Sequence, residues 1–328
     1  MTYIPTTDAQ REEMLAACGV AGIDDLFACI PPELAPRSFD LPTALSEMQV
    51  LDKLHGLAHQ NHADLLYFCG GGFYDHYIPA AVDALASRGE FYTAYTPYQP
   101  EASQGTLQAI YEYQSSICRL TDLHASNASL YDGGTALCEA CQMALRVTHR
   151  NRVVLDSGIN PVYRTMIRTY TANLAIEFDE CPVAHGQTDR EALLGALTDD
   201  TAAVILQNPN FFGVIDDHSD IVERCHERGI LAIQSVYPLA LPLLKSPGEM
   251  GVDIATGEGQ SLGLPLSFGG PYLGFMACTE KLVRRLPGRV VGRTVDRRGS
   301  DAYVLTLQAR EQHIRRAKAT SNICSNEA

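Results

Sequence analysis

The feature that most constrains the fold is an alternation of short apolar runs with longer amphipathic segments, which starts near Leu65. The apolar runs have the length and composition of strands, and they lie at residues 153–156, 174–178, 202–206, 230–236, 252–255 and 273–278. The amphipathic segments have helical periodicity and lie at residues 134–148, 162–172, 190–197 and 219–228. Strands and helices that alternate over short connections build a mostly parallel sheet with helices on both faces. The sequence therefore predicts an α/β domain of three layers, αβα.

The N-terminal part of the chain has helical patterns without intervening strands. Thr7 or Asp8 can cap a helix that continues to Ala17 and ends at Gly19. Thr43 can cap a longer helix that continues to about Gln60. We therefore expect a helical arm over residues 1–64, followed by the α/β domain over residues 65–319.

Charge and composition exclude several classes of function. The chain of 328 residues has a formal net charge of −14 and a sequence pI near 5.1, whereas binding to nucleic acid requires a positive surface. No basic segment followed by an apolar one opens the chain, and no apolar stretch is long enough to span a membrane, so neither secretion nor membrane insertion is expected. Ten cysteines in a chain too long to need disulfides indicate reduced thiols and a cytoplasmic location.

One basic stretch interrupts this acidic composition. Residues 281–298 carry Lys281, Arg284, Arg285, Arg289, Arg293, Arg297 and Arg298. Such a stretch can dock an acidic protein or a phosphate group, or it can be a solvated loop paired with acidic neighbours. The sequence leaves both interpretations open.

Two groups of potential metal ligands favour ordinary structural roles. His55, His59 and His62 can share one face of a helix, but no acidic residue completes a known metal-binding arrangement. Cys138 and Cys141 form a single CxxC pair inside a helical pattern, where small buried core residues are expected. We predict no metal site.

Gly133, Gly134 and Thr135 form a turn that opens a predicted helix. The N-terminus of a helix presents backbone N–H groups, and together with the threonine hydroxyl these could bind an anion. A tight turn into a helix also favours glycine for steric reasons alone. Both explanations stay open at this point.

Residues 90–105 crowd aromatic, proline and polar side chains into a stretch without helical or strand periodicity. Rigid amphipathic side chains of this kind suit a binding surface. The alternative is a tyrosine-rich loop that packs on the core with its hydroxyl groups bonded to the backbone.

Four sequence segments together resemble the N-terminal subunit of the two-subunit glycine decarboxylase P-protein. They are FYDHYIP at residues 73–79, YTAYTPYQPEASQG at 92–105, EGQSLGLPLSFGGPYLGFMA at 258–277 and TSNICSNEA at 320–328. The resemblance covers the chain from its first helix to its last residue. It implies the large domain of an aminotransferase-like, fold-type I pyridoxal-phosphate enzyme with seven strands. It also implies that residues 320–328 begin a small C-terminal domain that is truncated here.

The resemblance further implies that a lysine of the partner subunit holds pyridoxal phosphate as a Schiff base. When the chain is aligned on Pro265 and the following Gly-Gly-Pro turn, Gln260 takes the place of this lysine, and a glutamine cannot form that bond. Related enzymes pair the pyridine nitrogen with an aspartate, where this chain offers Gln234 and Ser235. The expected cofactor is therefore pyridoxal phosphate on the partner subunit, with none bound covalently to this chain.

By the same resemblance, the chain is a subunit of glycine dehydrogenase (aminomethyl-transferring) in an α2β2 assembly with the catalytic subunit. That enzyme decarboxylates glycine and passes the aminomethyl group to the lipoyl arm of H-protein. The stretch at 92–105 is expected to reach the partner's active site. The implied roles are catalysis across the interface for Tyr95, Tyr98, Gln99 and Glu101, contact with the partner's cofactor for Ser103 and Gln104, and a degenerate phosphate turn for Gly133, Gly134 and Thr135.

Two alternatives remain at the level of sequence. The chain could be a self-sufficient pyridoxal-phosphate enzyme that uses Lys245, one of only four lysines. It could instead be a scaffold or regulatory subunit with an empty ancestral pocket.

Overall fold

The computed structural model describes residues 5–34, 38, 40–68 and 70–323. It divides into two units, Met1–Phe68 and Cys69–Ala328, and each is considered by itself. Among the described residues, no helix combines the length and the apolar character needed to cross a bilayer.

The first unit is helical, as predicted, with α1 at Asp8–Cys18 and α2 at Glu47–Ala58. α1 agrees with the sequence: Thr7 caps its start, and Gly19 ends it with φ 72°. The predicted start of α2 at Thr43 is wrong. Ser46 is the cap, because its side chain accepts a hydrogen bond from Gln49 N–H while the Gln49 side chain accepts one from Ser46 N–H, at 2.9 Å.

A seven-stranded sheet forms the centre of the second unit, as the resemblance implied. Its strands are β1 (Ala125–Ser126), β2 (Arg152–Asp156), β3 (Glu177–Cys181), β6 (Thr201–Asn208), β7 (Leu231–Val236), β8 (Ile254–Glu258) and β9 (Gly274–Cys278). Their order is β1-β9-β8-β7-β6-β2-β3. β9 is antiparallel to both of its neighbours, and the other pairs are parallel, so the prediction of a mostly parallel sheet is confirmed.

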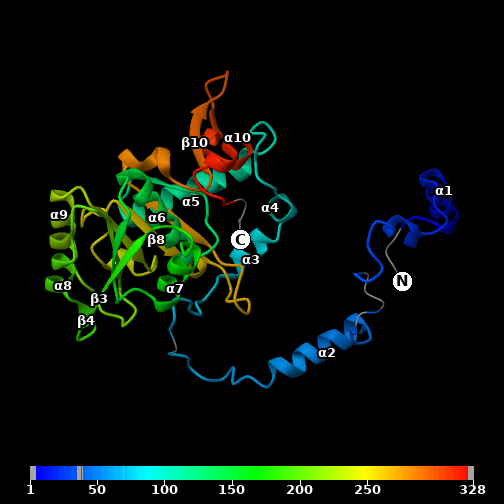
Figure 1. Cartoon of the computed structure of the whole chain (residues 1–328), viewed down its shortest axis with the longest axis horizontal. Helices are drawn as coiled ribbons and strands as arrows, with labels where there is room; N and C mark the ends of the chain where they lie inside the picture. The colour runs from blue at the N-terminus through cyan, green and yellow to red at the C-terminus, as the bar shows by residue number, and fades with distance from the viewer. Residues whose placement is uncertain (1–4, 35–37, 39, 69, 324–328) are drawn as a thin grey trace. The chain divides into compact units, whose positions relative to one another are not determined.

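Helices cover both faces of this sheet (Figure 1). They are α5 (Gln104–Thr121), α6 (Gly133–Thr148), α7 (Pro161–Tyr170), α8 (Arg190–Gly195) and α9 (Ser219–Glu227). Alternate strand residues face opposite layers: Val153 and Leu155 pack in the core of α6 and α7, whereas Val154 packs in the core of α8 and α9. α5 packs on the same face as α8 and α9, against Ala255, Phe275 and Ala277. The three-layer prediction is confirmed.

Smaller elements complete the unit. They are α3 (Ala80–Ala86), α4 (Gly89–Tyr92), α10 (Gln312–Arg315), the hairpin of β4 (Val183–Ala184) with β5 (Gln187–Thr188), and the hairpin of β10 (Val290–Val295) with β11 (Asp301–Thr306). In Figure 1 the β10–β11 hairpin projects from the layered part of the molecule.

Two predicted segments need correction. Only the last two residues of the run at 174–178 are in a strand: β3 starts at Glu177, because the edge strand carries polar residues that an apolar-run criterion passes over. Most of the arginine-rich stretch at 281–298 is regular structure rather than a loop, although its basic side chains other than Arg289 are exposed, as the solvated interpretation expected, and Arg293 pairs with Asp301. It contains the 3-10 helix Glu280–Arg285 and strand β10, and Arg289 is only 7% exposed.

The hairpin of β10 and β11 is anchored by two glutamines of α5, a helix that the sequence analysis did not predict. Gln114 donates to the carbonyl of Val291 at 3.0 Å and accepts from its N–H at 2.9 Å. Gln104 does the same with Tyr303, at 2.9 Å in both directions. Each side-chain amide thus pairs with a strand backbone as a neighbouring strand would.

Candidate functional site

The turn that opens α6 is ordered by its own side chains. Asp132 caps the helix and accepts a hydrogen bond from Thr135 N–H at 2.9 Å, and the Thr135 hydroxyl accepts one from Asp132 N–H at 3.0 Å. The same hydroxyl donates to the Asp132 carbonyl at 2.9 Å. The threonine that the sequence offered as an anion ligand therefore completes a capping box.

A carboxylate of the chain itself lies at this helix N-terminus. Glu258, the last residue of β8, is 4% exposed, and its Oε2 accepts a hydrogen bond from Gly133 N–H at 2.9 Å. Its Oε1 accepts from the N–H groups of Gln260 and Leu273, both at 3.0 Å. Burial raises the pKa of this carboxyl above its usual value, and the three N–H donors oppose that rise. The position at which the glycines predicted an anion is taken by a carboxyl group of the chain itself.

Gly133 and Gly134 allow a close approach of neighbouring side chains. A Cβ on Gly133 would lie 2.7 Å from the Tyr163 hydroxyl oxygen and 3.1 Å from Glu258 Cβ. A Cβ on Gly134 would lie 2.5 Å from Met166 Sδ. Both glycines are explained by this packing, which fills the space beside the turn.

Gln260, in the place of the expected lysine, is 2% exposed and engaged at both ends of its amide. Its Nε2 donates to the carbonyl of Leu264 at 2.7 Å, and its Oε1 accepts from Tyr74 N–H at 3.4 Å. The side chain thus holds the turn after β8 against the segment that contains Tyr74. It offers no nucleophilic amine.

The position expected for an aspartate is equally changed. Gln234 on β7 is 1% exposed, and its Nε2 lies 3.1 Å from Nδ1 of His218, while its Oε1 has no hydrogen-bond partner. Burial lowers the pKa of His218, and Asp216 opposes this shift. Gln234 presents an amide where related enzymes pair a carboxylate with the pyridinium nitrogen, so Gln260, Gln234 and Glu258 do not fit pyridoxal phosphate bound to this chain.

The FYDHYIP segment covers the turn that contains Gln260. Tyr74 and Tyr237 contact each other edge to face with ring centroids 5.2 Å apart, and His76 Nε2 is hydrogen-bonded to the Tyr237 hydroxyl. Phe73 stacks on Tyr272 at 4.3 Å. Aromatic rings therefore lie over the ends of β7 and β8.

The tyrosine-rich stretch connects α4 to α5, and its ends are helical, contrary to the prediction. Thr93 closes the short α4, and Gln104 begins α5. Tyr95 is 76% exposed, and Gln99 and Glu101 are also exposed. These side chains do not pack on the core.

Tyr98, in contrast, is tied to the chain's own structure. Arg289 donates to its hydroxyl at 2.7 Å and lies over its ring, with the guanidinium carbon 5.5 Å from the centroid. His313 contacts the ring edge to face. Ser103 is half-buried beside α5, and the Gln104 amide is occupied by Tyr303. The expected contacts of Ser103 and Gln104 with a cofactor stay predictions.

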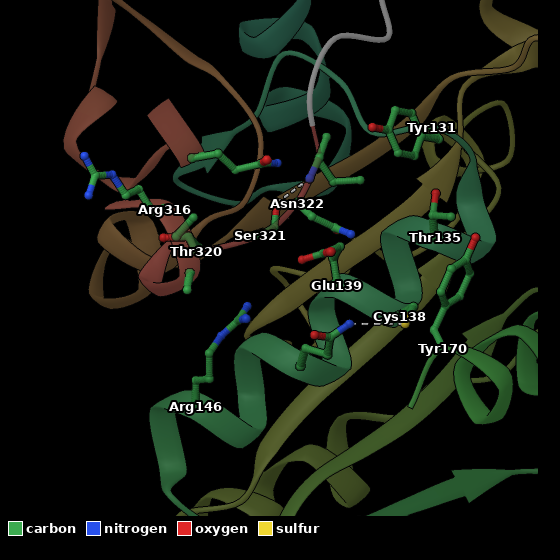
Figure 2. A pocket seen from close by; sticks show the side chains of 15 residues that line it. Tyr131, Thr135, Cys138, Glu139, Arg146, Tyr170, Arg316, Thr320, Ser321 and Asn322 are labelled. Carbon is green, nitrogen blue, oxygen red and sulfur yellow. Dashed lines mark hydrogen bonds between the residues drawn. The ribbon is translucent and has the colours of Figure 1, made fainter. Parts of the chain in front are cut away.

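A separate cavity of about 560 Å³ lies between α6 and the residues that follow α10. Figure 2 shows Glu139 pointing from α6 toward Ser321 and Asn322, with Arg146 farther along the same helix. Glu139 is 6% exposed, and its Oε2 has no hydrogen-bond partner. Burial raises the pKa of Glu139 to about 7, while Arg146 opposes the rise.

Three further predictions can be placed in the structure. Lys245 is bound at the surface, with its Nζ 2.9 Å from Asp217 Oδ2 and 2.8 Å from the Ser219 hydroxyl. Cys138 and Cys141 are buried in the core, as predicted, at 3% and 0% exposure. Within the described ranges, no three His, Cys, Asp or Glu side chains gather as metal ligands would.

Comparison with known proteins identifies the family. The family model described as "Glycine cleavage system P-protein" matches residues 1–328. The chain belongs to the P-protein family. Among curated relatives, a "Probable glycine dehydrogenase (decarboxylating) subunit 1" of Geotalea uraniireducens is 61% identical over 328 residues, which is all of this chain and 74% of the relative. The protein of the same name from Nitratidesulfovibrio vulgaris is 58% identical with the same coverage.

A solved P-protein has the same fold. The crystal structure of glycine decarboxylase (P-protein) of the glycine cleavage system, in inhibitor-bound form, superposes with a TM-score of 0.90 at 48% identity. The match covers 99% of this chain and 74% of that chain. The resemblance drawn from the four sequence segments is therefore confirmed.

Glu258 is a residue of this site that was not predicted from the sequence. The available signal was an acidic residue at the carboxyl end of a buried strand, two positions before Gln260. A charged side chain at that end of a strand must find donors or reach solvent. The predicted turn at the start of α6 provided such donors.

Proposed function

We propose that this chain is the cofactor-less subunit of a two-subunit glycine decarboxylase. It combines with a catalytic subunit as α2β2, and the pyridoxal phosphate of that partner acts as an electron sink for the loss of carbon dioxide from glycine. The aminomethyl group passes to the lipoyl arm of H-protein. The observation that carries the proposal is Gln260, a buried amide bonded to Leu264 and Tyr74 where a cofactor-binding P-protein subunit needs an amine.

The exposed part of the tyrosine-rich stretch is this chain's contribution to the shared site. Tyr92 and Tyr95 are 83% and 76% exposed, although aromatic rings of this size are normally buried in a core or at an interface. Their contacts are supplied by the partner subunit, where Tyr95, Gln99 and Glu101 position glycine or the lipoyl arm. Tyr98 is held by Arg289 and aligns the stretch.

The test compares the purified chain with pyridoxal phosphate, alone and then with its partner subunit. We expect no visible band that borohydride fixes to this chain alone, and exchange of bicarbonate with the glycine carboxyl once the partner is added. A reducible band on this chain at Lys245 would overturn the proposal in favour of a self-sufficient enzyme. If the partner subunit alone exchanged bicarbonate as fast as the mixture, this chain would be a scaffold without a part in catalysis.

Substitution of the exposed tyrosine tests the shared site. Tyr95→Ala is expected to lower the exchange rate of the assembled enzyme about 10- to 100-fold, as the loss of one or two positioning contacts does. Tyr170→Ala is the matched control, because Tyr170 is 62% exposed on α7, outside the stretch. Equal rates for both variants would remove the tyrosine-rich stretch from the proposed site.

A further inference from the structure

We propose that the Glu258 carboxylate is a built-in replacement for an external phosphate at the N-terminus of α6. Glu258 is thereby a specificity-determining residue that closes this subunit to phosphate-bearing ligands. The inference rests on the proposed function and deepens it, because it explains how this P-protein subunit excludes the phosphate group of the cofactor. Its geometry and its test concern this chain alone.

The donors around Glu258 form the array that an anion requires. The N–H groups come from three places in the fold: Gly133 at the start of α6, Gln260 after β8 and Leu273 before β9. Each lies 2.9–3.0 Å from a carboxylate oxygen, so both oxygens are bonded. Backbone donors that converge at a helix N-terminus are the usual basis of phosphate binding in proteins. The α6 turn has therefore kept the donors of an anion site while filling it from within.

The position of Glu258 in the sheet holds its carboxylate at the donors. As the last residue of β8 it pairs with Gly274 of β9, and Gly259 N–H donates to the Leu273 carbonyl at 2.6 Å. The carboxylate is thus attached to the rigid frame that also carries two of its donors. An internal group of this kind has a very high effective concentration, so a dissolved anion cannot compete with it.

Side chains pack closely against both glycines of the turn. The Tyr163 hydroxyl and Glu258 Cβ lie within 3.1 Å of the Cβ position of Gly133, and Met166 Sδ lies 2.5 Å from that of Gly134. Removal of the Glu258 side chain is the change that would free both the donors and the space. The site should then accept an external anion.

The test measures the stabilisation of the 328-residue chain by inorganic phosphate, with chloride at equal ionic strength as the reference. For Glu258→Ala we expect phosphate to raise the unfolding temperature by about 2–4 °C at a concentration roughly tenfold above its Kd. For the unsubstituted chain and for Glu139→Ala we expect no difference between phosphate and chloride. Glu139 is the matched control because it is a similarly buried carboxyl, on α6, whose Oε2 has no hydrogen-bond partner.

The result that overturns the inference is a folded Glu258→Ala chain that phosphate does not stabilise, or equal stabilisation of the unsubstituted chain. Should the variant not fold in chloride, the readout becomes the folded fraction after refolding in phosphate. Recovery in phosphate supports the inference, and no recovery contradicts it. Because neither partner subunit nor glycine is present, this outcome is independent of the exchange assay.

Discussion

Glu258, which is hydrogen-bonded to the N-terminus of α6, and Glu139, which lies within α6, are two buried carboxyls with different surroundings. Glu258 is 4% exposed and accepts three backbone hydrogen bonds. Glu139 is 6% exposed, and one of its oxygens has no partner. The burial of the two groups is nearly equal, so the number of donors is what separates them.

The difference lies in the donors that the fold provides for a buried charge. A buried charge is tolerated when donors surround it, and the fold at Glu258 supplies the donors that a bound anion would otherwise use. At Glu139 the fold supplies burial without donors, and the side chain faces a cavity instead. Burial raises the pKa of both carboxyls, but backbone donors oppose the rise only at Glu258.

The largest expected effect comes from loss of the Glu258 carboxylate. Glu258→Ala leaves three N–H groups without partners, two of them buried and one partly buried, and each such loss costs about 1–3 kcal/mol, so we expect the free energy of unfolding to fall by about 3 kcal/mol or more. Urea unfolding at pH 7 measures it. Glu139→Ala, which leaves no donor unpaired, is expected to lower the free energy of unfolding by less than about 1 kcal/mol. Similar losses of unfolding free energy in the two variants would contradict the view that backbone donors distinguish Glu258 from Glu139.

The ionisation of Glu139 is expected to make the free energy of unfolding depend on pH. Its pKa is about 7 in the fold against a usual 4.5, so the folded chain holds a proton that the unfolded chain has lost between these values. Stability therefore falls as pH rises from about 4.5 to 7, by up to about 3 kcal/mol, and stays low above. Glu139→Gln removes this fall: we expect it to be more stable than the parent at pH 8 and equal to it at pH 4.5.

The control for this measurement is the pH profile rather than a single value. A gain of Glu139→Gln that is the same at pH 4.5 and pH 8 would show that improved packing, and not ionisation, is the cause. Unfolding free energies at several pH values between 4 and 8 distinguish the two cases.

The layers could be predicted from sequence because they depend on periodic apolar residues. Helix α5 was missed because two of its buried positions are Gln114 and Thr121, and the burial of Gln114 is compensated by the backbone of Val291. The turn at Gly133 was predicted, but its anion was not, because Glu258 lies 125 residues away along the chain. Only the folded sheet brings the two together.

The smallest expected effect tests whether tight packing holds the donors of α6 in place. Gly134→Ala puts a Cβ 2.9 Å from the Tyr163 ring and 2.5 Å from Met166 Sδ. We expect the free energy of unfolding to fall by about 1–2 kcal/mol, since overpacking outweighs the better helix propensity of alanine. Gly195→Ala, in α8 with no atom within 4 Å of the added Cβ, should be neutral or stabilising by up to about 1 kcal/mol. If both variants behaved alike in urea unfolding, close packing would not position the first turn of α6, which the capping box and the hydrogen bond to Glu258 would then hold.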